Sequence, residues 1–480
     1  MTVDYKKIGL KCGLEIHQQL GTEQKLFCGC PTTMHEKNSI MLLTRKQHPV
    51  ASELGELDIT AQHEYLRNRT FYYQVFANEN CLVECDEEPP HELNKEALEI
   101  ALQVALLLNC SIPNEIHVMR KTIIDGSTTT SFQRTMIVGV NGFLRYKGKR
   151  VEIKHVSLEE DAAAIVKEDE KSATFRLNRL GIPLIEVGTG IIVGYTPEDV
   201  QDIAYNIGMI IRSTGKAKKG LGTIRQDVNV SVKNGERVEV KGVQELGILA
   251  KVIDLEVERQ MSLPKVARDV RAALPDGTTK FTRPLPGAAR MYPETDVQPI
   301  IVDANYLSGL KKNLPEGWEV RLQRIRRMGL SDQLADQIVK SEHVDLFEKI
   351  VKERKVAASV VANTFTNILK DLRREQIPVE NLRDEHFYKI FDLLRKSTIA
   401  KEAMQPILKE LAREPNKDVT SVVRDLGLEA ITLTELKRII QQVKSKNPDA
   451  PHDKILGLVM SRVRGKIDAQ IVVKEVKKMI

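Results

Sequence analysis

Alternation of apolar and polar side chains with a period of two runs through the chain as far as Asp296 and then stops. The clearest stretch is IRQDVNVSV at residues 224–232, where valine and isoleucine alternate with charged and polar residues. A period of two is the repeat of a β-strand, because successive strand side chains point to opposite faces of the sheet. The sequence therefore predicts a mixed β-sheet domain over residues 1–296.

Beyond Asp296 the apolar residues recur at helical spacing, and strand alternation almost disappears. We expect amphipathic helices there, grouped into a helical domain over residues 297–396 and a helical tail over residues 397–480. Two helices are also expected within the first domain, at residues 93–108 and 197–214. The predicted fold class is therefore α+β, with a mixed-sheet domain followed by two all-α domains.

The composition is that of a globular protein from a reducing compartment. The 480 residues are 42% apolar and 29% charged, which argues against long disordered segments. Six cysteines are too few for a disulfide framework, and no apolar run approaches the roughly 18 residues of a membrane-spanning helix. We expect a cytoplasmic location.

The two commonest nucleotide-binding loops are missing from the sequence. It has neither a G-x-x-x-x-G-K-[ST] loop nor a G-x-G-x-x-G turn after a strand. Both motifs cradle phosphate groups with backbone N–H donors. If the protein uses ATP, it holds the nucleotide in another way.

Charged side chains are embedded in several of the expected strands. Residues 12–17 place Glu15 and His17 on one strand face, and the strands at 224–232 and 237–241 are joined by an Asn234-Gly235 turn. Buried singly, each carboxylate needs a salt bridge or a metal. Together they form the oxygen-rich ligand set that Mg²⁺ prefers, with cations suited to phosphate. The candidates are Glu15, His17, Glu159, Glu186, Arg225, Asp227, Asn229, Ser231, Glu239 and Lys241.

Four of the six cysteines lie in two short spacings. Cys28-x-Cys30 and Cys81-x₃-Cys85 offer four thiolates to a structural zinc ion. The spacing is looser than that of two C-x₂-C knuckles, and ordinary buried thiols explain it equally well. Both interpretations stay open.

Eight stretches resemble the GatB/GatE family, the catalytic subunits of tRNA-dependent amidotransferases. Lying between residues 9 and 296, they are GLEIHQQL, KLFCGC, CLVECDEEPPHELN, SLEEDAA, NRLGIPLIEVGTG, IRQDVNVSV, RVEVKGV and MYPETD. The closing stretch VMSRVRGKIDAQ resembles the family's YqeY-like tail. The resemblance implies a catalytic cradle domain over residues 1–296, a helical domain over 297–396 and a tRNA-binding, YqeY-like tail over 397–480.

Within this family, the sequence resembles the archaeal E-type members most. The E-type segments are RKTIIDGSTTTSFQRT at 120–135, HPVASELGELD at 48–58 and LPDGTTKFTRPLPGAARMYPETD at 274–296. The insert that E-type members carry ahead of PDGTT, similar to a domain of bacterial aspartyl-tRNA synthetases, is missing. A C-P-x-C pair that B-type members carry is missing as well, which puts B-type zinc ligation in doubt.

The resemblance implies a reaction and a set of site residues. The chain would phosphorylate the side-chain carboxylate of glutamate carried by tRNA(Gln), using ATP, and ammonia would then displace the phosphate to give Gln-tRNA(Gln). By motif match, the Mg²⁺ ligands would be His17, Glu159 and Glu186. A second metal or phosphate position, also counted as catalytic, would be formed by Glu15, Asp227 and Glu239. Nucleotide or glutamyl contacts are expected from Arg225, Asn229, Ser231 and Lys241, and further substrate contacts from Asp125, Ser127 and Arg134.

The resemblance also implies partners. An asparaginase-like D subunit, GatD, would supply ammonia in a D₂E₂ heterotetramer, and tRNA(Gln) charged with glutamate would be the substrate. From Lys401 onward the chain has 16 Lys/Arg against 11 Asp/Glu, which suits tRNA phosphates, although a solvated helix surface explains the same charges. Candidate phosphate contacts are Lys437, Arg438, Lys444, Lys446, Arg462, Arg464 and Lys466.

Two alternatives stay open at this point. The chain could be a B-type member of a GatCAB complex, working with amidase-like and C-type partners. It could also be a tRNA-binding scaffold without catalysis. The presence of every acidic and histidine position named for the metal argues against the scaffold.

Overall fold

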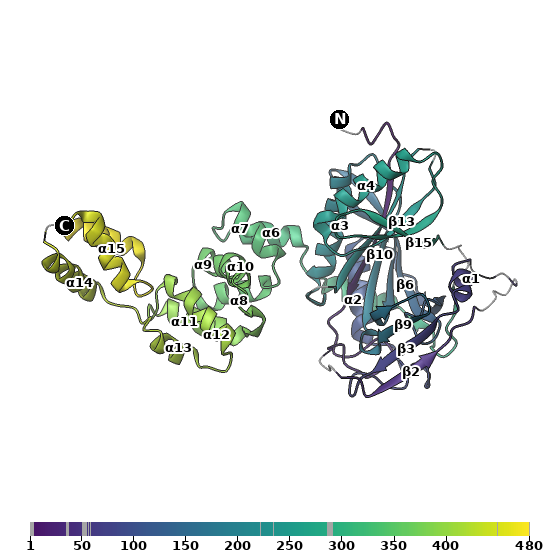
Figure 1. Ribbon diagram of the computed structural model, residues 1–480, viewed down its shortest axis with the longest axis horizontal. Coiled ribbons are helices and arrows are strands. Elements are labelled where there is room, and N and C mark those ends of the chain that lie inside the picture. Colours follow the sequence, from purple (N-terminus) through teal and green to yellow (C-terminus); the bar gives the residue numbers. More distant parts are fainter. Residues whose placement is uncertain are drawn as a thin grey trace. The chain divides into compact units, whose positions relative to one another are not determined.

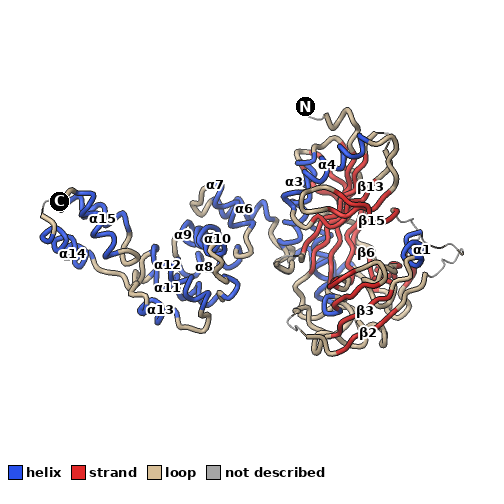
Figure 2. The backbone as a smooth tube through the Cα atoms, viewed as in Figure 1, coloured by secondary structure: helices blue, strands red, loops and turns tan. Residues whose placement is uncertain are grey.

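The protein is described by a computed structural model that covers residues 4–34, 38–49, 55, 57, 59–220, 222–233, 235–285, 291–448 and 450–479 (Figure 1). The chain forms two compact units, Met1–Gly317 and Trp318–Ile480. Among the described residues, strands occur only in the first unit, and the second consists of helices and their connections (Figure 2). The predicted α+β class is confirmed.

A large mixed sheet is the framework of the first unit. Its strands follow the order β15-β14-β13-β12-β1-β10-β7-β6-β5-β16, and β11 pairs with β1. Neighbouring strands of this sheet are antiparallel except for the parallel pair β13–β14. The bounds are β1 Lys11–Gln19, β5 Met119–Thr122, β6 Phe132–Tyr146, β7 Lys149–Glu160, β10 Pro183–Thr189, β11 Ile192–Val193, β12 Ile224–Ser231, β13 Val238–Val243, β14 Asp269–Ala273, β15 Thr279–Pro284 and β16 Met291–Pro293.

Helices α2 (Lys95–Leu107), α3 (Pro197–Ser213) and α4 (Leu249–Ser262) cover one face of this sheet. Helix α2 packs on β6 and β7, α3 on β1, and α4 on β12. Buried aliphatic side chains from the helices and the strands form one continuous core. Burying this apolar area is the main force that holds the layer together.

Strand β1 shows how the sheet separates its two faces. Cys12, Leu14 and Ile16 lie in the apolar core under the helices. The alternate residues Glu15 and His17 point to the other face, yet His17 is only 6% exposed. The second face of the sheet is therefore polar but largely shielded from water.

Two smaller sheets complete the first unit. One has the order β2-β3-β9-β8, with β2 Met41–Arg45, β3 Thr70–Val75, β8 Ala164–Glu168 and β9 Ser172–Arg176, and has its own aromatic-rich core. The other pairs β4 (Glu115–Ile116) with β17 (Ile300–Ile301). The remaining helices of the unit are α1 Ile59–Leu66 and α5 Ala304–Lys312.

The second unit is helical throughout its described residues. Its last three helices share a separate aliphatic cluster that contains Leu436, Ile440, Val459, Val472 and Val476. The helices are α6 Trp318–Arg326, α7 Asp332–Lys340, α8 Val344–Arg354, α9 Ala358–Asn363, α10 Leu369–Arg374, α11 Asp384–Arg395, α12 Met404–Arg413, α13 Val419–Asp425, α14 Leu433–Lys446, α15 His452–Val463 and α16 Ala469–Met479.

The two helices predicted within the first domain are present as α2 and α3. The side chain of Asn94 caps α2, and Thr196 forms a capping box with Asp199 at the start of α3. The expected turn at Asn234-Gly235 includes Asn234, which lies outside the described residues, as does most of the segment at 48–58. No helix in the described parts of the chain is long and apolar enough to span a membrane.

The division between the units falls after Gly317, because α5 packs on α2 and its Leu310 belongs to the core of the first unit. The boundaries expected from sequence, at residues 297 and 397, stay predictions.

Gly139 lies on β6 at a close approach of α2. A Cβ atom at this position would lie 2.7 Å from the Cβ of Ala105 and 2.9 Å from that of Cys110. We expect Gly139→Ala to lower the free energy of unfolding by about 1–3 kcal/mol, because the helix must move off the sheet. Calorimetric unfolding of the full chain measures the change.

Gly247→Ala is the matched control, since a Cβ atom there meets nothing within 4 Å and the backbone φ is not positive. We expect it to change stability by less than about 0.5 kcal/mol. Equal effects of the two substitutions would show that the approach of α2 is not close enough to require glycine.

Candidate active site

The register of β1 against its two neighbours brings the predicted residues together. His17 lies opposite Glu186 of β10 and opposite Arg225 of β12, and Glu15 lies opposite Asp227. In the antiparallel ladder, directly opposite side chains on the same face are within contact distance. Residues from widely separated parts of the sequence therefore meet at the middle of one sheet.

Glu186 is held by two histidines. His17 Nε2 lies 3.1 Å from Glu186 Oε2, and His155 Nε2 of β7 lies 2.8 Å from Glu186 Oε1. Gly188, opposite His155 in the register, leaves room for this ring, because a Cβ there would lie 2.4 Å from His155 Cε1. Both oxygens of Glu186 thus have a fixed partner.

Glu159 of β7 lies on the same face of the sheet. Its carboxylate accepts hydrogen bonds from Thr135 Oγ1 at 2.6 Å and from Gln133 Nε2 at 3.0 Å. The ammonium of Lys121 on β5 donates to Glu159 Oε1 at 3.3 Å and lies 3.7 Å from Glu186 Oε2. Lys121 therefore connects two of the three predicted Mg²⁺ ligands.

A second acidic group adjoins the first and shares Glu15 with it. In this second group, one oxygen from each of Glu15, Asp227 and Glu239 lies within 4.8 Å of the other two. In the first group, one ligand atom from each of Glu15, His17 and Glu186 meets the same limit. The Lys241 ammonium lies 2.8 Å from Glu239 Oε1 and 3.2 Å from Asp227 Oδ2. The backbone N–H of Gly242 also donates to Asp227 at 2.8 Å.

The electrostatics of the two groups favour the charged forms of Glu186 and Asp227. Burial opposes ionisation of Glu186, but Lys121 and the two histidines hold the pKa of Glu186 well below its usual range. The pKa of Asp227 is lowered in the same way, against burial, chiefly by Lys241. Burial and the nearby Glu186 charge instead raise the pKa of Glu15, so Glu15 gains most from an added cation.

His17 has one buried ring nitrogen without a hydrogen-bond partner. Its Nε2 lies against Glu186, whereas Nδ1 is buried and contacts no donor or acceptor among the described residues. Once the ring is neutral, an imidazole with one nitrogen bonded to a carboxylate offers the other as a metal ligand. Carboxylate oxygens suit Mg²⁺ or Mn²⁺, and imidazole suits divalent transition-metal ions, so the residues fit a divalent ion.

The remaining predicted nucleotide contacts line the same face. Arg225, Asn229 and Ser231 are half-buried along β12. Arg225 Nη1 lies 3.8 Å from Asp161 Oδ1, and Asn229 lies opposite Glu239 in the register. These residues border the acidic groups, and their role as ligands stays a prediction.

The three residues singled out in the E-type loop lie elsewhere. Asp125 accepts a hydrogen bond from the backbone N–H of Ser127 at 2.9 Å, and its Oδ2 is 4.0 Å from Arg283 Nη1. Arg134 lies on β6 between Gln133 and Thr135, whose side chains both contact Glu159. It therefore points to the opposite face of the sheet.

On that opposite face Arg134 belongs to a buried ionic network. Its Nε donates to Glu294 Oε2 at 2.8 Å, and its Nη1 lies 3.4 Å from Glu160. Arg120 reaches the other oxygen of Glu294 at 2.5 Å. The network ties the end of the central sheet to the segment after β16.

The thiols form a separate group, with one difference from the predicted set. Cys28, Cys30, Cys81 and Glu84 bring one ligand atom each within 4.8 Å of one another. Cys85 packs instead in the core of the smaller sheet. Lys25 Nζ donates to Glu84 Oε1 at 2.5 Å, and Glu84 Oε2 lies 3.0 Å from Cys81 Sγ. Glu84 therefore takes the place that the sequence suggested for Cys85.

Three residues of these sites were missed by sequence reasoning: Lys121, His155 and Glu84. Lys121 lies in the segment resembling E-type members, and Glu84 lies between Cys81 and Cys85, so both are close to recognisable motifs. Their contacts depend on which strands are neighbours in the sheet, and the spacing of residues within one motif does not indicate which strands pair.

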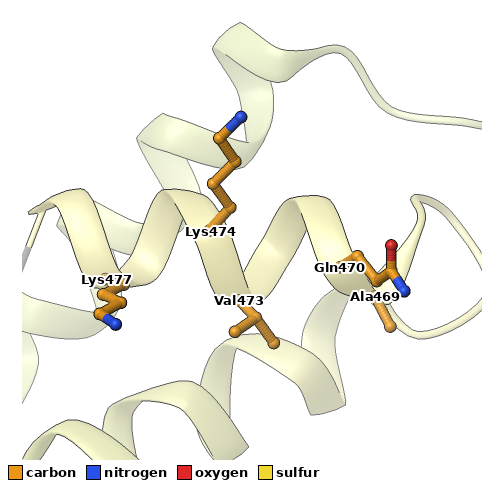
Figure 3. A pocket seen from close by; sticks show the side chains of 5 residues that line it. All are labelled: Ala469, Gln470, Val473, Lys474 and Lys477. Atoms are coloured by element: carbon orange, nitrogen blue, oxygen red, sulfur yellow. The ribbon is translucent and has the colours of Figure 1, made fainter.

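The last three helices carry most of the basic residues predicted to contact phosphate. Arg438, Lys444, Lys446, Arg462 and Arg464 are exposed, and Lys466 is half-buried. Lys437 is also exposed but lies 3.8 Å from Glu475. A hollow of about 430 Å³ along α16 adds two further lysines (Figure 3); it is lined by Ala469, Gln470, Val473, Lys474 and Lys477.

Comparison with known proteins gives two family matches. The family described as the GatB/GatE catalytic domain matches residues 10–308, and the one described as the GatB domain matches residues 345–480. The chain is also similar to archaeal proteins named as the E subunit of glutamyl-tRNA(Gln) amidotransferase. It is 32% identical to that of Methanocaldococcus jannaschii (98% of each chain), 33% to that of Aeropyrum pernix (100% of this chain, 98% of the other) and 34% to that of Sulfolobus acidocaldarius (99% and 98%).

These alignments extend over 620 to 631 positions, although this chain has only 480 residues. The relatives therefore carry a long stretch without a counterpart here, in keeping with the missing insert. In the structure, the connection between α4 and β14 includes the exposed Leu263. Exposed connections of this kind accept inserted domains most readily.

The Arg134 network gives a prediction about stability. We expect Arg134→Met to lower the free energy of unfolding by about 3–5 kcal/mol, because it leaves the buried Glu160 without its cation and removes one of the two arginines that hold Glu294. Asp296→Asn is the control, because the Asp296 carboxylate lies 3.3 Å from Arg120 in a half-exposed ion pair. It should lower the free energy of unfolding by less than about 1 kcal/mol. Urea unfolding followed by circular dichroism measures both, and equal losses would contradict a structural role for Arg134.

Proposed function

The chain belongs to the GatB/GatE family, and on that premise we propose that it is an E-type subunit that converts glutamate on tRNA(Gln) into glutamine. The observation that carries the proposal is the pair of acidic groups joined by Glu15 on the polar face of the central sheet. This arrangement suits a reaction in which negative charge moves between two anions, because cations bound there neutralise it.

The proposed reaction has two steps. First, a carboxylate oxygen of the tRNA-linked glutamate attacks the γ-phosphorus of ATP; the bond to the β-phosphate oxygen breaks, and ADP leaves. Then ammonia attacks the carbonyl carbon of the acyl phosphate, phosphate leaves with the bonding electrons, and the nitrogen loses a proton. A free carboxylate cannot be amidated directly because oxide is a very poor leaving group.

We assign Mg²⁺ to His17, Glu159 and Glu186, with a second position at Glu15, Asp227 and Glu239. His17 and Glu186 lie in the first acidic group with Glu15, and Glu159 adjoins that group through Lys121, which contacts both Glu159 and Glu186. Bound Mg²⁺ would stabilise charge on the transferred phosphoryl group. The protein holds these donors in place through β1, β7, β10, β12 and β13, whose register fixes the side chains. His155 orients Glu186 from the second oxygen.

Basic and amide groups next to the acids are suited to the anionic substrates. Arg225, Asn229, Ser231 and Lys241 lie on or beside the same face, and we assign them to nucleotide or glutamyl contacts. Arginine and lysine bind phosphate with charge-assisted hydrogen bonds. The largely buried face limits water, which would otherwise hydrolyse the acyl phosphate.

Ammonia would come from a partner of the asparaginase-like D type, in a D₂E₂ assembly with this chain. The sequence contains no hydrolase signature of its own. An amidase-like partner that copurifies in its place would instead favour a B-type member.

We assign tRNA binding to the basic surface of α14, α15 and α16. Lysine and arginine side chains there are exposed, and phosphate contacts provide most of the affinity of basic surfaces for nucleic acid. Because this tail has no phenylalanine, tyrosine or tryptophan, we expect recognition of backbone and shape rather than stacking on bases.

We further propose that Cys28, Cys30, Cys81 and Glu84 hold a structural zinc ion. Thiolate and carboxylate ligands in a closed group of four are typical of such sites. Lys25 fixes one oxygen of Glu84 and leaves the other directed at the thiols. Such a hydrogen bond orients a ligand for the metal.

Glu186→Gln tests the catalytic assignment. We expect tRNA-dependent formation of ADP to fall by more than about 100-fold, because loss of even an outer-shell partner of a metal costs 10–100-fold. Affinity for glutamyl-tRNA, measured by filter binding, should be retained.

Glu170→Gln is the control, because Glu170 is exposed in the turn between β8 and β9. Its activity should equal that of the unmodified chain. A Glu186→Gln variant with full activity would remove Glu186 from the site, and a chain that binds tRNA without forming ADP would support the scaffold alternative.

Cysteine substitutions test the zinc proposal. We expect elemental mass spectrometry to find about one zinc ion per chain. The zinc should be lost in Cys81→Ser and retained in Cys85→Ala, because Cys81 belongs to the group of four ligands and Cys85 does not. Loss of zinc in Cys85→Ala would restore the four-thiolate site suggested by the sequence. Absence of zinc from the unmodified chain would favour ordinary buried thiols.

A further inference from the structure

Lys121 occupies a position between the carboxylates that we assign to Mg²⁺. Its Nζ donates to Glu159 Oε1 at 3.3 Å and lies 3.7 Å from Glu186 Oε2. His17 Nε2 approaches the same Glu186 oxygen at 3.1 Å. One ammonium therefore lies within ion-pair distance of two carboxylates at the centre of the site.

This contact differs from an ordinary surface ion pair. The side chains of Glu159 and Glu186 are 3% and 9% exposed, and that of Lys121 is 28% exposed. The Lys121 ammonium is within ion-pair distance of both carboxylates, so two buried like charges share this cation.

A divalent ion held by Glu159 and Glu186 would compete with this ammonium. Mg²⁺ binds carboxylate oxygen at about 2.0–2.1 Å, so it needs the space beside the oxygens that Lys121 now contacts. Two cations about 4 Å apart also repel strongly in a shielded site. The ammonium and the metal are therefore alternatives at these oxygens.

The second acidic group has the same construction. Lys241 Nζ lies 2.8 Å from Glu239 Oε1 and 3.2 Å from Asp227 Oδ2. Lys121 comes from β5, at one side of the sheet, and Lys241 from β13, at the other. Each acidic group thus has its own lysine, and Lys121 is supplied by a strand that carries none of the acids.

We propose that Lys121 is an internal counter-ion that holds Glu159 and Glu186 in place and exchanges with the metal ion on loading. Once released, its flexible four-carbon stem lets the ammonium contact the phosphoryl group that is transferred, since lysine binds phosphate as a mobile point charge. This inference rests on the proposed function, because it takes these carboxylates to be the metal ligands.

The test is Mn²⁺ binding to the full-length chain, followed by electron paramagnetic resonance of the free ion. We expect Lys121→Met to bind Mn²⁺ at least about 5-fold more tightly than the unmodified chain, because a competing cation has been removed. Lys121→Arg keeps the positive charge and should bind more weakly than Lys121→Met. Lys154→Met removes a lysine from an exposed position on β7 and should leave the affinity unchanged.

A second readout separates exchange from a purely structural role. Lys121→Met should bind Mn²⁺ more tightly and yet form ADP about 10²-fold more slowly, because the released cation no longer reaches the phosphoryl group. If Lys121 only supported the fold, its substitution would lower both the affinity for Mn²⁺ and the rate of ADP formation. Circular dichroism of the variant verifies that the sheet is intact.

The outcomes distinguish this inference from the function on which it rests. Unchanged or weaker Mn²⁺ binding by a folded Lys121→Met overturns the exchange of lysine and metal. The metal assignment itself fails if the unmodified chain binds no Mn²⁺. It also fails if Glu186→Gln binds as much Mn²⁺ as the unmodified chain. Tighter binding with slower phosphoryl transfer supports both.

Discussion

The antiparallel pairing of β1 with β10 and β12 places His17 opposite Glu186 and Glu15 opposite Asp227. A slip of one residue would turn every side chain of β1 to the other face of the sheet. Leu14 and Ile16 would then enter the polar face, and the charged residues would enter the aliphatic core beneath α2, α3 and α4. Because burying unpaired charge there is very unfavourable, packing on the apolar face fixes the geometry of the polar one.

The polar face is built from charges that stabilise one another. A buried carboxylate needs hydrogen bonds or a cation, and removal of one partner leaves an uncompensated charge. Glu186 has His17, His155 and Lys121 around it, and Asp227 has Lys241 and the Gly242 N–H. The groups come from strands between β13 and β5 in the central sheet, so the arrangement exists only when that sheet is paired. Folding and formation of the site are therefore one event in this unit.

The sequence predicted the fold class and the face on which most site residues lie. Alternation in residues 12–17, 224–232 and 237–241 identified strands whose polar residues share a face, and β1, β12 and β13 have that arrangement. Helices α2 and α3 were predicted from apolar spacing and capping residues. These features are local, since they depend on residues a few positions apart.

Contacts across the sheet could not be predicted in the same way. Lys121 and Glu159 are separated by 38 positions, and His155 and Glu186 by 31. Their meeting depends on the strand order β10-β7-β6-β5 and on the register of each pair of strands. The exchange of Cys85 for Glu84 has a similar cause: the turn after Cys81 directs the Glu84 carboxylate toward the thiols and Cys85 toward the smaller core. Arg134 was grouped with substrate contacts because it lies in the segment that resembles E-type members.

The balance of charge on the polar face explains why the site calls for divalent cations. Five carboxylates belong to the two acidic groups and their Glu159 neighbour: Glu15, Glu159, Glu186, Asp227 and Glu239. Among the described residues, the lysines within ion-pair distance of this set are Lys121 and Lys241, and its other ion partners are histidines.

The five carboxylates of this set therefore outnumber its two lysines by three. The raised pKa of Glu15, which lies in both groups, follows from burial together with this excess. A divalent ion removes more of the excess than an ammonium does, because it carries twice the charge and approaches the oxygens more closely. Electrostatics alone thus favours exchange of a lysine for a metal, and it leaves a mobile cation beside the place where a phosphate group would bind.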